Sequence, residues 1–462
     1  MTLPDVSPAT AQTPALRTVA VLTLGCKLNQ AESEAIAREL ARAGCRVVDR
    51  PVQADAYVIN SCSVTHVADR KTRHLVRLAR RLSPAATVVL TGCYPETVGV
   101  EAARAVGADL VVPGRAKHTV AGRLLALRPP AGPAPQGEGA RRTRAFIKAQ
   151  EGCNDVCAFC IVPRTRGRER SLSPAAVVAA VREREEEGVQ EVVITGTQLG
   201  AYGRDRNDLG DGPAVLIRAL LEETSVPRIR FSSLQPQDIT PELVALWEDP
   251  RLCRHFHLAL QSGCDSVLQR MRRRYTAAQY RHALALIREM VPDVAVTTDV
   301  IVGFPGETEE EAAASLAFCR EAEFALMHVF PYSRRPGTLA HRMDGHVPEP
   351  IKRARVEAML QVARASATAF RRRFLGRTLP VLWEGLTRAA GAEPVWEGLT
   401  DNYVRVYTRS AADLRNRILA VRLVAEAEDG LWGELDGGVE PAVRRVEGET
   451  IPLEVRTASD HG

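Results

Sequence analysis

The distribution of apolar residues divides the chain into three regions, and the first region alternates predicted strands with predicted helices. From residue 17 to about residue 125, short runs rich in β-branched residues are separated by segments of helical period. The predicted strands are residues 19–24, 57–60, 88–91 and 110–112. This α/β alternation predicts a small doubly wound parallel sheet, which would bind ligands at the carboxyl ends of its strands.

The second region repeats the order of strand then helix about six times. Its predicted strands are residues 146–149, 191–195, 228–232, 255–260, 295–301 and 325–330. Six such units predict a partial (β/α)6 barrel, a fold that carries its chemistry in the loops after the strands. A long helix is predicted to follow at residues 350–373.

The third region, from residue 379 to about residue 452, loses the helical period and contains short β-like runs. The phrase Trp-Glu-Gly-Leu-Thr occurs twice in it, beginning at Trp383 and at Trp396. This pattern predicts a small β-barrel.

A Pro- and Gly-rich stretch separates the first two regions and indicates a linker. The domain boundaries that we expect are residues 16–127, a linker at 128–143, residues 144–373 and residues 376–445.

Three cysteines follow the first strand of the predicted barrel within eight residues. Cys153, Cys157 and Cys160 stand in a C-x3-C-x2-C pattern. Tetrahedral zinc and an ordinary iron–sulfur cluster usually take four protein ligands, so three thiolates leave one coordination position for something other than protein. The alternative interpretations are a zinc knuckle with a distant fourth ligand, and chance clustering.

Three further cysteines follow predicted strands of the first region. Cys26, Cys62 and Cys93 come after the first, second and third of these strands. Because the carboxyl ends of parallel strands meet at one edge, we expect the three thiols to lie together. The alternative is that each is a buried structural thiol. We expect packing roles for the remaining cysteines, which are Cys45, Cys253, Cys264 and Cys319.

Length and composition are those of a multidomain globular protein. The 462 residues exceed one ordinary core, and 45% hydrophobic with 25% charged residues is enough for several cores. No run approaches the roughly 18 apolar residues of a membrane span, so we expect no membrane association. Ten cysteines without a secretory signal indicate a reducing compartment, and we expect the cytoplasm. The net charge of +5 is too small to establish a nucleic-acid partner.

The residues around the barrel cysteines extend their pattern into a longer motif, C-N-x-x-C-x-x-C-x-x-P-x-x-R-G-x-x-R-S, which runs from Cys153 to Ser171. This motif resembles that of the methylthiotransferase branch of the radical S-adenosylmethionine (SAM) superfamily. Residues 398–406 resemble the TRAM domain, an RNA-binding module that forms the carboxyl-terminal part of these enzymes. With Cys26, Cys62 and Cys93 in the first domain, the resemblance covers nearly the whole chain in order.

The resemblance implies two 4Fe-4S clusters. Cys153, Cys157 and Cys160 would be the catalytic ligands of a cluster whose open iron binds SAM. Cys26, Cys62 and Cys93 would hold a second cluster, where the sulfur or methylthio unit is assembled. An electron would cleave SAM to a 5′-deoxyadenosyl radical, which removes the hydrogen from an unactivated adenine C2. The SAM contacts implied are Gly196, Gln198, Ser233, Gln261, Gly303 and Gly306.

The resemblance is greatest to the branch that acts on N6-threonylcarbamoyladenosine. Lys27 follows Cys26, whereas the isopentenyladenosine branch usually has Gln-Met-Asn there. We therefore expect methylthiolation of C2 of that nucleoside at tRNA position 37. A cationic Lys27 facing the threonyl carboxylate is our hypothesis for this preference, and an ordinary exposed lysine is the alternative. The partners implied are the tRNA anticodon stem-loop and an electron donor such as flavodoxin or ferredoxin. The oligomeric state is open, with a monomer expected. The alternatives are an isopentenyladenosine tRNA enzyme, a ribosomal-protein aspartate methylthiotransferase, and a zinc-dependent RNA-binding protein without catalysis.

One position departs from the branch, and several basic residues stand near the predicted barrel mouth. Gln235 occupies a position where related sequences generally carry Glu, which leaves its role open. Cations are expected there for the tRNA backbone, with a solvated basic surface as the alternative. The arginines concerned are Arg164, Arg166, Arg168, Arg170, Arg270, Arg272, Arg273 and Arg274.

Overall fold

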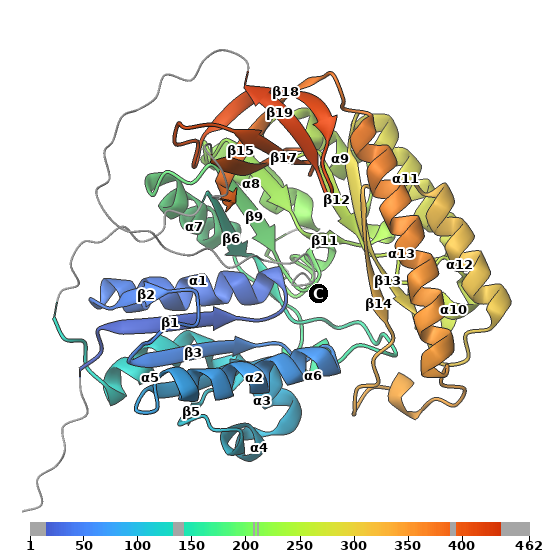
Figure 1. The fold of residues 1–462 in the computed structure, drawn as a ribbon. Coiled ribbons are helices and arrows are strands. Elements are labelled where there is room, and N and C mark those ends of the chain that lie inside the picture. Colours follow the sequence, from blue (N-terminus) through green and yellow to red (C-terminus); the bar gives the residue numbers. More distant parts are fainter. Residues whose placement is uncertain (1–14, 133–142, 207, 210–211, 389–393, 436–462) are drawn as a thin grey trace, which may run out of the picture. The chain divides into compact units, whose positions relative to one another are not determined.

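The computed structural model describes residues 15–132, 143–206, 208–209, 212–388 and 394–435 (Figure 1). These residues form two compact units. The first contains the residues up to 132 except residues 64–66, which group with the second. Most of the linker expected at residues 128–143, and residues 436–445 of the expected terminal domain, lie outside the described residues.

The first unit is built on a five-stranded parallel sheet of order β2-β1-β3-β4-β5. Its strands are β1 (Thr18–Thr23), β2 (Arg46–Val48), β3 (Ala56–Ser61), β4 (Thr87–Gly92) and β5 (Leu110–Val111). The four strands that the apolar runs predicted are present, and β2 is an additional edge strand. The doubly wound sheet predicted for this region is confirmed.

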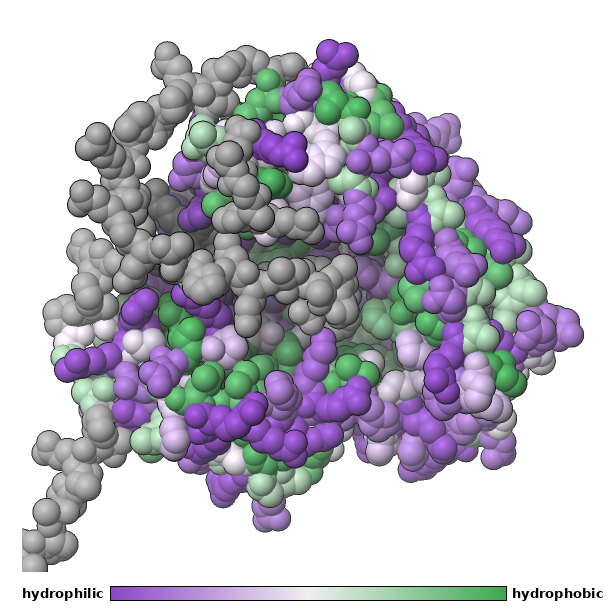
Figure 2. Space-filling model, in the orientation of Figure 1, coloured by the Kyte–Doolittle hydropathy of each residue, from purple (hydrophilic) through white to green (hydrophobic). Residues whose placement is uncertain are grey.

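Helices cover both faces of this sheet because successive side chains of each strand point to opposite faces. Val19 and Val21 of β1 share a core with Leu40 of the first helix, whereas Leu22 shares the other core with Val76 of the second. Figure 2 shows hydrophilic residues gathered over the outer side of the second helix. The helices are α1 (Lys27–Arg42), α2 (His66–Leu82), α3 (Cys93–Val98), α4 (Val100–Ala105), η1 (Gly114–Thr119) and α5 (Val120–Leu127).

The second unit contains the partial barrel, whose strands form two parallel sheets of order β10-β9-β6 and β11-β12-β13-β14. The chain passes from one sheet to the next at Ser232, so the strand predicted at residues 228–232 ends one residue early. The six predicted strands are confirmed. The barrel strands are β6 (Arg144–Lys148), β9 (Glu191–Thr195), β10 (Arg228–Phe231), β11 (Ser233–Leu234), β12 (His255–Leu258), β13 (Ala295–Val302) and β14 (Leu326–Pro331).

Helices lie along the outer side of these strands (Figure 1). Thr276 and Thr308 begin two of them with reciprocal capping boxes, which satisfy backbone N–H groups of the first turn. The long helix predicted at residues 350–373 is α13. No helix of the described chain is long and apolar enough to cross a membrane. The longer helices are α7 (Pro174–Glu186), α8 (Pro213–Glu223), α11 (Ala277–Met290), α12 (Glu309–Glu321) and α13 (Glu349–Arg372).

The carboxyl-terminal strands close into a small barrel of order β15-β16-β17-β19-β18, as the sequence predicted. The two copies of the repeated phrase pair antiparallel, with Trp383 opposite Gly398. A Cβ atom on Gly398 would lie 2.8 Å from the Trp383 ring, so glycine lets the buried indole fit. The strands are β15 (Thr378–Arg388), β16 (Val395–Thr400), β17 (Arg405–Arg409), β18 (Ile418–Glu426) and β19 (Leu431–Leu435).

This small barrel packs against the amino-terminal ends of the partial barrel's strands. Arg228, at the start of β10, donates to the carbonyl oxygens of Leu399 (2.9 Å) and Pro380 (2.7 Å). Arg254, just before β12, pairs with Asp401 at 2.6 Å. The cysteine loop follows the carboxyl end of β6, so the small barrel and the cysteine loop lie at opposite ends of the strands.

Candidate functional site

The cysteine loop between β6 and α6 (Val162–Thr165) is shaped by Gln150 and Gly152. Gly152 has a φ of +77°, and a Cβ atom there would lie 2.0 Å from the carbonyl oxygen of Arg168. The position therefore requires glycine. The Gln150 side chain donates to the Gly152 carbonyl oxygen (2.8 Å) and accepts from the backbone N–H of Gln198 (3.0 Å). These hydrogen bonds hold the cysteine loop against the loop that follows β9.

The thiols of Cys153, Cys157 and Cys160 are partly exposed and lie close enough to influence one another. Burial, with a smaller contribution from the neighbouring cysteines, raises the pKa of Cys153 to about 11 and the pKa of Cys160 to about 12. Thiols of this kind give up their protons when a metal provides the positive charge. The donor set is therefore suited to a soft metal centre.

Arg273 provides a cation beside these thiols. Its Nη1 donates to Sγ of Cys157 at 3.3 Å, and its Nη2 donates to Oε1 of Gln235 at 3.0 Å. Its Nε donates to the hydroxyl oxygen of Tyr275 at 3.1 Å. Gln235 in turn donates to the carboxylate of Asp155 at 3.3 Å. Gln235 thus links the cysteine loop to Arg273.

Gln198 places an unpartnered amide nitrogen beside the loop. Its Oε1 accepts a hydrogen bond from Sγ of Cys153 at 3.3 Å. Its Nε2 is buried and has no hydrogen-bond partner within the described part of the chain. A buried donor left unpaired costs about 1–3 kcal/mol, so a ligand with an acceptor group would stabilise it. Gly196, in the same loop, would place a Cβ atom 3.0 Å from Oε1 of Gln150.

Four other residues expected at the SAM site stand at the ends of later strands. Ser233 comes two residues after the carboxyl end of β10, where the short strand β11 begins, and Gln261 follows β12 with a φ of +66°. Gly303 and Gly306 lie in the turn after β13, each with a φ of +75°. A Cβ atom on Gly303 would lie 2.6 Å from Cγ of Lys352, which excludes larger residues there. All four therefore stand at the end of the barrel that carries the cysteine loop.

In the first unit, Cys26, Cys62 and Cys93 follow β1, β3 and β4 respectively. Gly25 has a φ of +101°, and a Cβ atom there would lie 2.6 Å from Cβ and 2.9 Å from Sγ of Cys62. The loop that carries Cys26 therefore lies against Cys62. Cys26 is exposed, whereas Cys62 and Cys93 are buried.

A buried polar network holds this edge together. Asn29 donates to the carbonyl oxygen of Ser61 (3.1 Å), and Asn60 donates to the carbonyl oxygen of Asn29 (2.9 Å). Lys117 donates to Oδ1 of Asn29 at 3.2 Å. The backbone of Gly92 lies so close to Ser61 that a Cβ atom on Gly92 would lie 2.2 Å from the Ser61 carbonyl oxygen. The network holds in place the strand ends that carry the cysteines. In the sequence, the polar residues at the ends of apolar strands are the signal that could have predicted this network.

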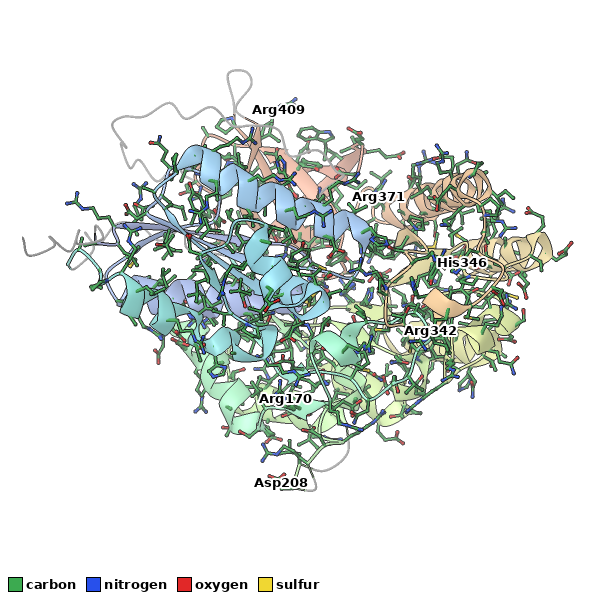
Figure 3. The ribbon with its side chains drawn as sticks, turned by 90° about the horizontal axis from the view of Figure 1, so that it is seen from below. Arg170, Asp208, Arg342, His346, Arg371 and Arg409 are labelled. Carbon is green, nitrogen blue, oxygen red and sulfur yellow. The ribbon has the colours of Figure 1, made fainter. Side chains whose placement is uncertain are left out.

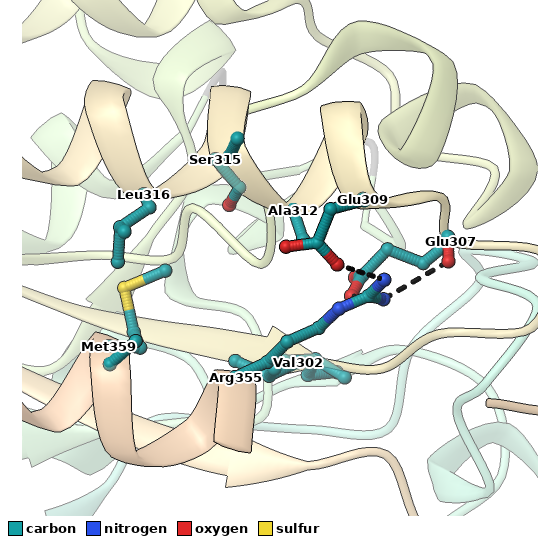
Figure 4. A pocket seen from close by; sticks show the side chains of 11 residues that line it. Val302, Glu307, Glu309, Ala312, Ser315, Leu316, Arg355 and Met359 are labelled. Carbon is teal, nitrogen blue, oxygen red and sulfur yellow. Dashed lines mark hydrogen bonds and ion pairs between the residues drawn. The ribbon is translucent and has the colours of Figure 1, made fainter. Parts of the chain in front are cut away.

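A cavity of about 120 Å³ lies apart from the cysteine loop, between β13, α12 and α13 (Figure 4). Arg355 spans its polar end through ion pairs with Glu307 (2.9 Å) and Glu309 (3.0 Å). Leu316 and Met359 line the other end. The cavity is a gap in the packing of helices against the outer face of the strands.

Known proteins share both units of this architecture. Residues 147–319 match the profile of the Radical SAM superfamily, and residues 18–113 match Uncharacterized protein family UPF0004. Threonylcarbamoyladenosine tRNA methylthiotransferase MtaB of Bacillus subtilis (strain 168) is 36% identical, covering 88% of this chain and 94% of its own length. The chain belongs to the radical SAM methylthiotransferase family. The protein of the same name from Thermotoga maritima is 33% identical, with 90% and 96% coverage.

A second group of relatives of this methylthiotransferase carries another name. The tRNA-2-methylthio-N(6)-dimethylallyladenosine synthase of Syntrophobacter fumaroxidans is 34% identical, covering 93% of this chain and 98% of its own length. Among solved structures, the radical S-adenosylmethionine methyltransferase TsrM from Kitasatospora setae aligns with a TM-score of 0.52 at 15% identity. That alignment covers 70% of this chain and 77% of TsrM, and it shows a shared fold.

Family membership implies a 4Fe-4S cluster and SAM, and the residues present fit both. Three thiols stand in one loop, and the unpaired amide of Gln198 lies beside Cys153 as a donor for a bound ligand. Within the described residues, no three His, Cys, Asp or Glu side chains converge on a position for a single metal ion. Of the cysteines for which we expected packing roles, Cys45, Cys253 and Cys319 are buried and Cys264 is partly buried.

The arginines expected at the barrel mouth of the methylthiotransferase divide into two groups. Arg273 is held against Cys157, and Arg166 is buried. Arg170, labelled in Figure 3, is exposed and pairs with Glu151 at 3.6 Å. Two others are used in ion pairs, Arg270 with Glu311 and Arg274 with Asp155. The exposed members are Arg164, Arg168, Arg170, Arg272 and Arg274.

Sequence reasoning missed a polar row on one face of the barrel sheet. Nε2 of His257 lies 3.3 Å from Oδ2 of Asp299, and its Nδ1 lies 3.1 Å from Oγ1 of Thr297. His255 and His257 alternate with apolar residues in β12. Polar residues at every second position of an apolar strand indicate a face turned toward a barrel interior, and that signal was available in the sequence.

Proposed function

We propose that this protein transfers a methylthio group to C2 of N6-threonylcarbamoyladenosine at tRNA position 37. The observation that carries the proposal is the likeness, over nearly the whole length, to the threonylcarbamoyladenosine methylthiotransferases of Bacillus subtilis and Thermotoga maritima. Lys27, next to Cys26 in the first turn of α1, is partly buried and adds a cation suited to the threonyl carboxylate.

In this proposal, Cys153, Cys157 and Cys160 hold the catalytic 4Fe-4S cluster, and Cys26, Cys62 and Cys93 hold a second one. When bound, the catalytic cluster and SAM supply a radical able to remove hydrogen from an unactivated adenine carbon. The chain positions these groups. The unpaired Nε2 of Gln198 would donate to an acceptor on SAM. The other contacts proposed for SAM are Gly196, Ser233, Gln261, Gly303 and Gly306.

Arg273 and the small barrel serve different parts of the proposed reaction. Arg273 donates a charged hydrogen bond to Cys157 and so favours the thiolate that ligates iron. Arg409 lies on the small barrel and is labelled in Figure 3. Its guanidinium lies 5.0 Å from the centre of the Trp432 ring, which lies 5.7 Å from the Tyr407 ring. Exposed arginine beside aromatic rings is suited to RNA binding through charge and base stacking.

The proposed partners are the tRNA anticodon stem-loop and a small electron donor such as flavodoxin or ferredoxin. The target base must leave its stack to reach the site, as enzymes that act on bases generally require. We propose that the protein works as a monomer in the cytoplasm, where its tRNA substrate is found.

Reconstituted protein with SAM and dithionite tests the proposal directly. The substrates are one tRNA transcript carrying N6-threonylcarbamoyladenosine and a matched transcript carrying isopentenyladenosine. We expect the 2-methylthio product, measured by mass spectrometry of nucleosides, from the first substrate alone. Product from the second alone would favour the other candidate function, that of the dimethylallyladenosine synthases, which the 34% identity to the Syntrophobacter fumaroxidans protein supports.

A further inference from the structure

Helix α2 carries a row of arginines on its outer face. We define the arginine row as Arg70, Arg73, Arg77 and Arg81, which are spaced by three, four and four residues. At 3.6 residues per turn, these positions lie within an arc of roughly 80°. Arg70, Arg77 and Arg81 are exposed, and Arg73 is partly buried. The opposite face, which includes Val76, is buried against the sheet.

No acidic side chain accompanies the arginine row on its helix. The only acidic residue of α2 is Asp69, which is buried and accepts a hydrogen bond from Ser63 at 2.6 Å. Arg80 points elsewhere and donates to the carbonyl oxygens of Ala86 (2.8 Å) and Gly107 (3.0 Å). Within the described residues, no member of the row makes an ion pair or a side-chain hydrogen bond.

A row of like charges without acidic neighbours destabilises the helix that carries it. Like charges three or four residues apart on a helix repel one another by a few tenths of a kcal/mol per pair, and solvated surfaces usually mix both signs. The outer side of α2 is strongly hydrophilic (Figure 2), so an apolar partner or a membrane interior does not suit it. Arginine is the residue that binds phosphate oxygens with two parallel hydrogen bonds. The row is therefore complementary to a polyanion.

The position of the row indicates which polyanion. Helix α2 begins four residues after Cys62, at the edge of the sheet that carries Cys26, Cys62 and Cys93. At a rise of 1.5 Å per residue, the row extends along the helix for roughly 16 Å. This length is enough to face several consecutive phosphates of one nucleic-acid strand.

We propose that the arginine row of α2 binds the phosphate backbone of the tRNA stem next to the anticodon loop. The inference rests on the proposed function, because that function makes tRNA the polyanion in question. It assigns to the first unit an RNA-binding role of its own, separate from the exposed arginines of the cysteine loop and from the small barrel.

The test measures binding of the full-length reconstituted protein to an anticodon stem-loop RNA by fluorescence anisotropy over a range of salt concentrations. The variant is R70Q/R77Q/R81Q. The matched control is R104Q/R115Q/R123Q, which removes three exposed arginines from the same unit without touching α2. We expect the α2 variant to bind at least about tenfold more weakly. Its salt slope should fall by about two to three, because each of the three lost phosphate contacts lowers the slope by about 0.7–0.9. The control should match the wild type.

The remaining readouts separate a binding defect from misfolding. Iron content, circular dichroism and SAM cleavage without RNA should be unchanged in the α2 variant. The charge-conserving variant R70K/R77K/R81K should keep the wild-type salt slope. An α2 variant with wild-type slope, or an equal loss in variant and control, would overturn the inference. Slower reduction by flavodoxin with unchanged RNA binding would instead make the row a protein-docking surface and also overturn it.

Failure of the proposed function gives a different result. If the wild type binds the RNA through α2 but methylthiolates another tRNA nucleoside, the RNA-binding role of the arginine row is supported and the proposed substrate is contradicted. If the wild type has no affinity for tRNA, both the proposed function and the RNA-binding role of the arginine row are contradicted.

Discussion

The guanidinium group of Arg273 lies 3.3 Å from Sγ of Cys157, although 116 residues separate the two along the chain. The same guanidinium is held by Oε1 of Gln235 at 3.0 Å and by the Tyr275 hydroxyl at 3.1 Å, so its orientation is fixed by two other side chains. A fixed cation that hydrogen-bonds to a cluster ligand stabilises the more negative, reduced state of that cluster.

Replacing Arg273 tests this relationship. We expect Arg273→Gln to lower the reduction potential of the catalytic cluster and to slow reductive SAM cleavage by about 10–100-fold, as loss of hydrogen bonds to metal ligands typically does. Potentiometric titration followed by electron paramagnetic resonance measures the first effect. Arg274→Gln is the control, because Arg274 pairs with Asp155 and, among the residues that the structure describes, makes no hydrogen bond to a cysteine. Equal potentials in wild type and Arg273→Gln would show that Arg273 has only a packing role.

The two cysteine triads are expected to have separable roles. Two clusters predict about eight irons per chain after anaerobic reconstitution. The variant C153A/C157A/C160A should keep about half of this iron and lose SAM cleavage. The variant C26A/C62A/C93A should also keep about half, while it retains SAM cleavage and forms no methylthio product. Four irons in the wild type, unchanged in the second variant, would contradict a second cluster.

The attachment of the small barrel is expected to depend on Asp401. Asp401→Ala removes the 2.6 Å ion pair with Arg254 and leaves that guanidinium only its longer contact with Asp293 at 3.7 Å. We therefore expect the free energy of unfolding to fall by about 2 kcal/mol. Glu426→Ala is the matched control, since it breaks an exposed ion pair with Arg372 that also joins the small barrel to the partial barrel. That loss should stay below about 1 kcal/mol. Denaturant unfolding measures both, and equal losses would argue against a special role for Asp401.

Glu191 is expected to make stability depend on pH in the acid range. Burial would raise the pKa of Glu191, but the charges of Arg230, Arg144 and Arg228 outweigh it and lower the pKa to about 2 from an ordinary 4.5. A lowered pKa stabilises the fold above pH 4.5, and the contribution disappears as the pH falls toward 2. At pH 7 it is on the order of 3 kcal/mol.

The comparison of wild type with Glu191→Gln measures this contribution. The difference in free energy of unfolding between the two cluster-free proteins should be largest at neutral pH and should narrow below pH 4.5. A difference that does not change between pH 7 and pH 3 would show that the ionisation of Glu191 does not stabilise the fold.

The strands could be predicted from the sequence because apolar runs of fixed length and strand-end cysteines are local signals. The contact between Arg273 and Cys157 could not, since charge alone assigned Arg273 to the RNA-facing surface and only the fold turns it inward. The attachment of the small barrel through Arg228 and Asp401 is likewise a contact between residues far apart in the chain. The edge strand β2 is only three residues long, and the short strand-like run at Cys45 does not by itself predict a strand of the sheet.

The nucleoside content of tRNA from a strain that lacks this protein tests the central claim most directly. Mass spectrometry of digested tRNA should show loss of 2-methylthio-N6-threonylcarbamoyladenosine, with N6-threonylcarbamoyladenosine accumulating in its place. Expression of the wild type, but not of C153A/C157A/C160A, should restore the modification. Retention of 2-methylthio-N6-threonylcarbamoyladenosine together with loss of the 2-methylthio isopentenyl nucleoside would contradict the account.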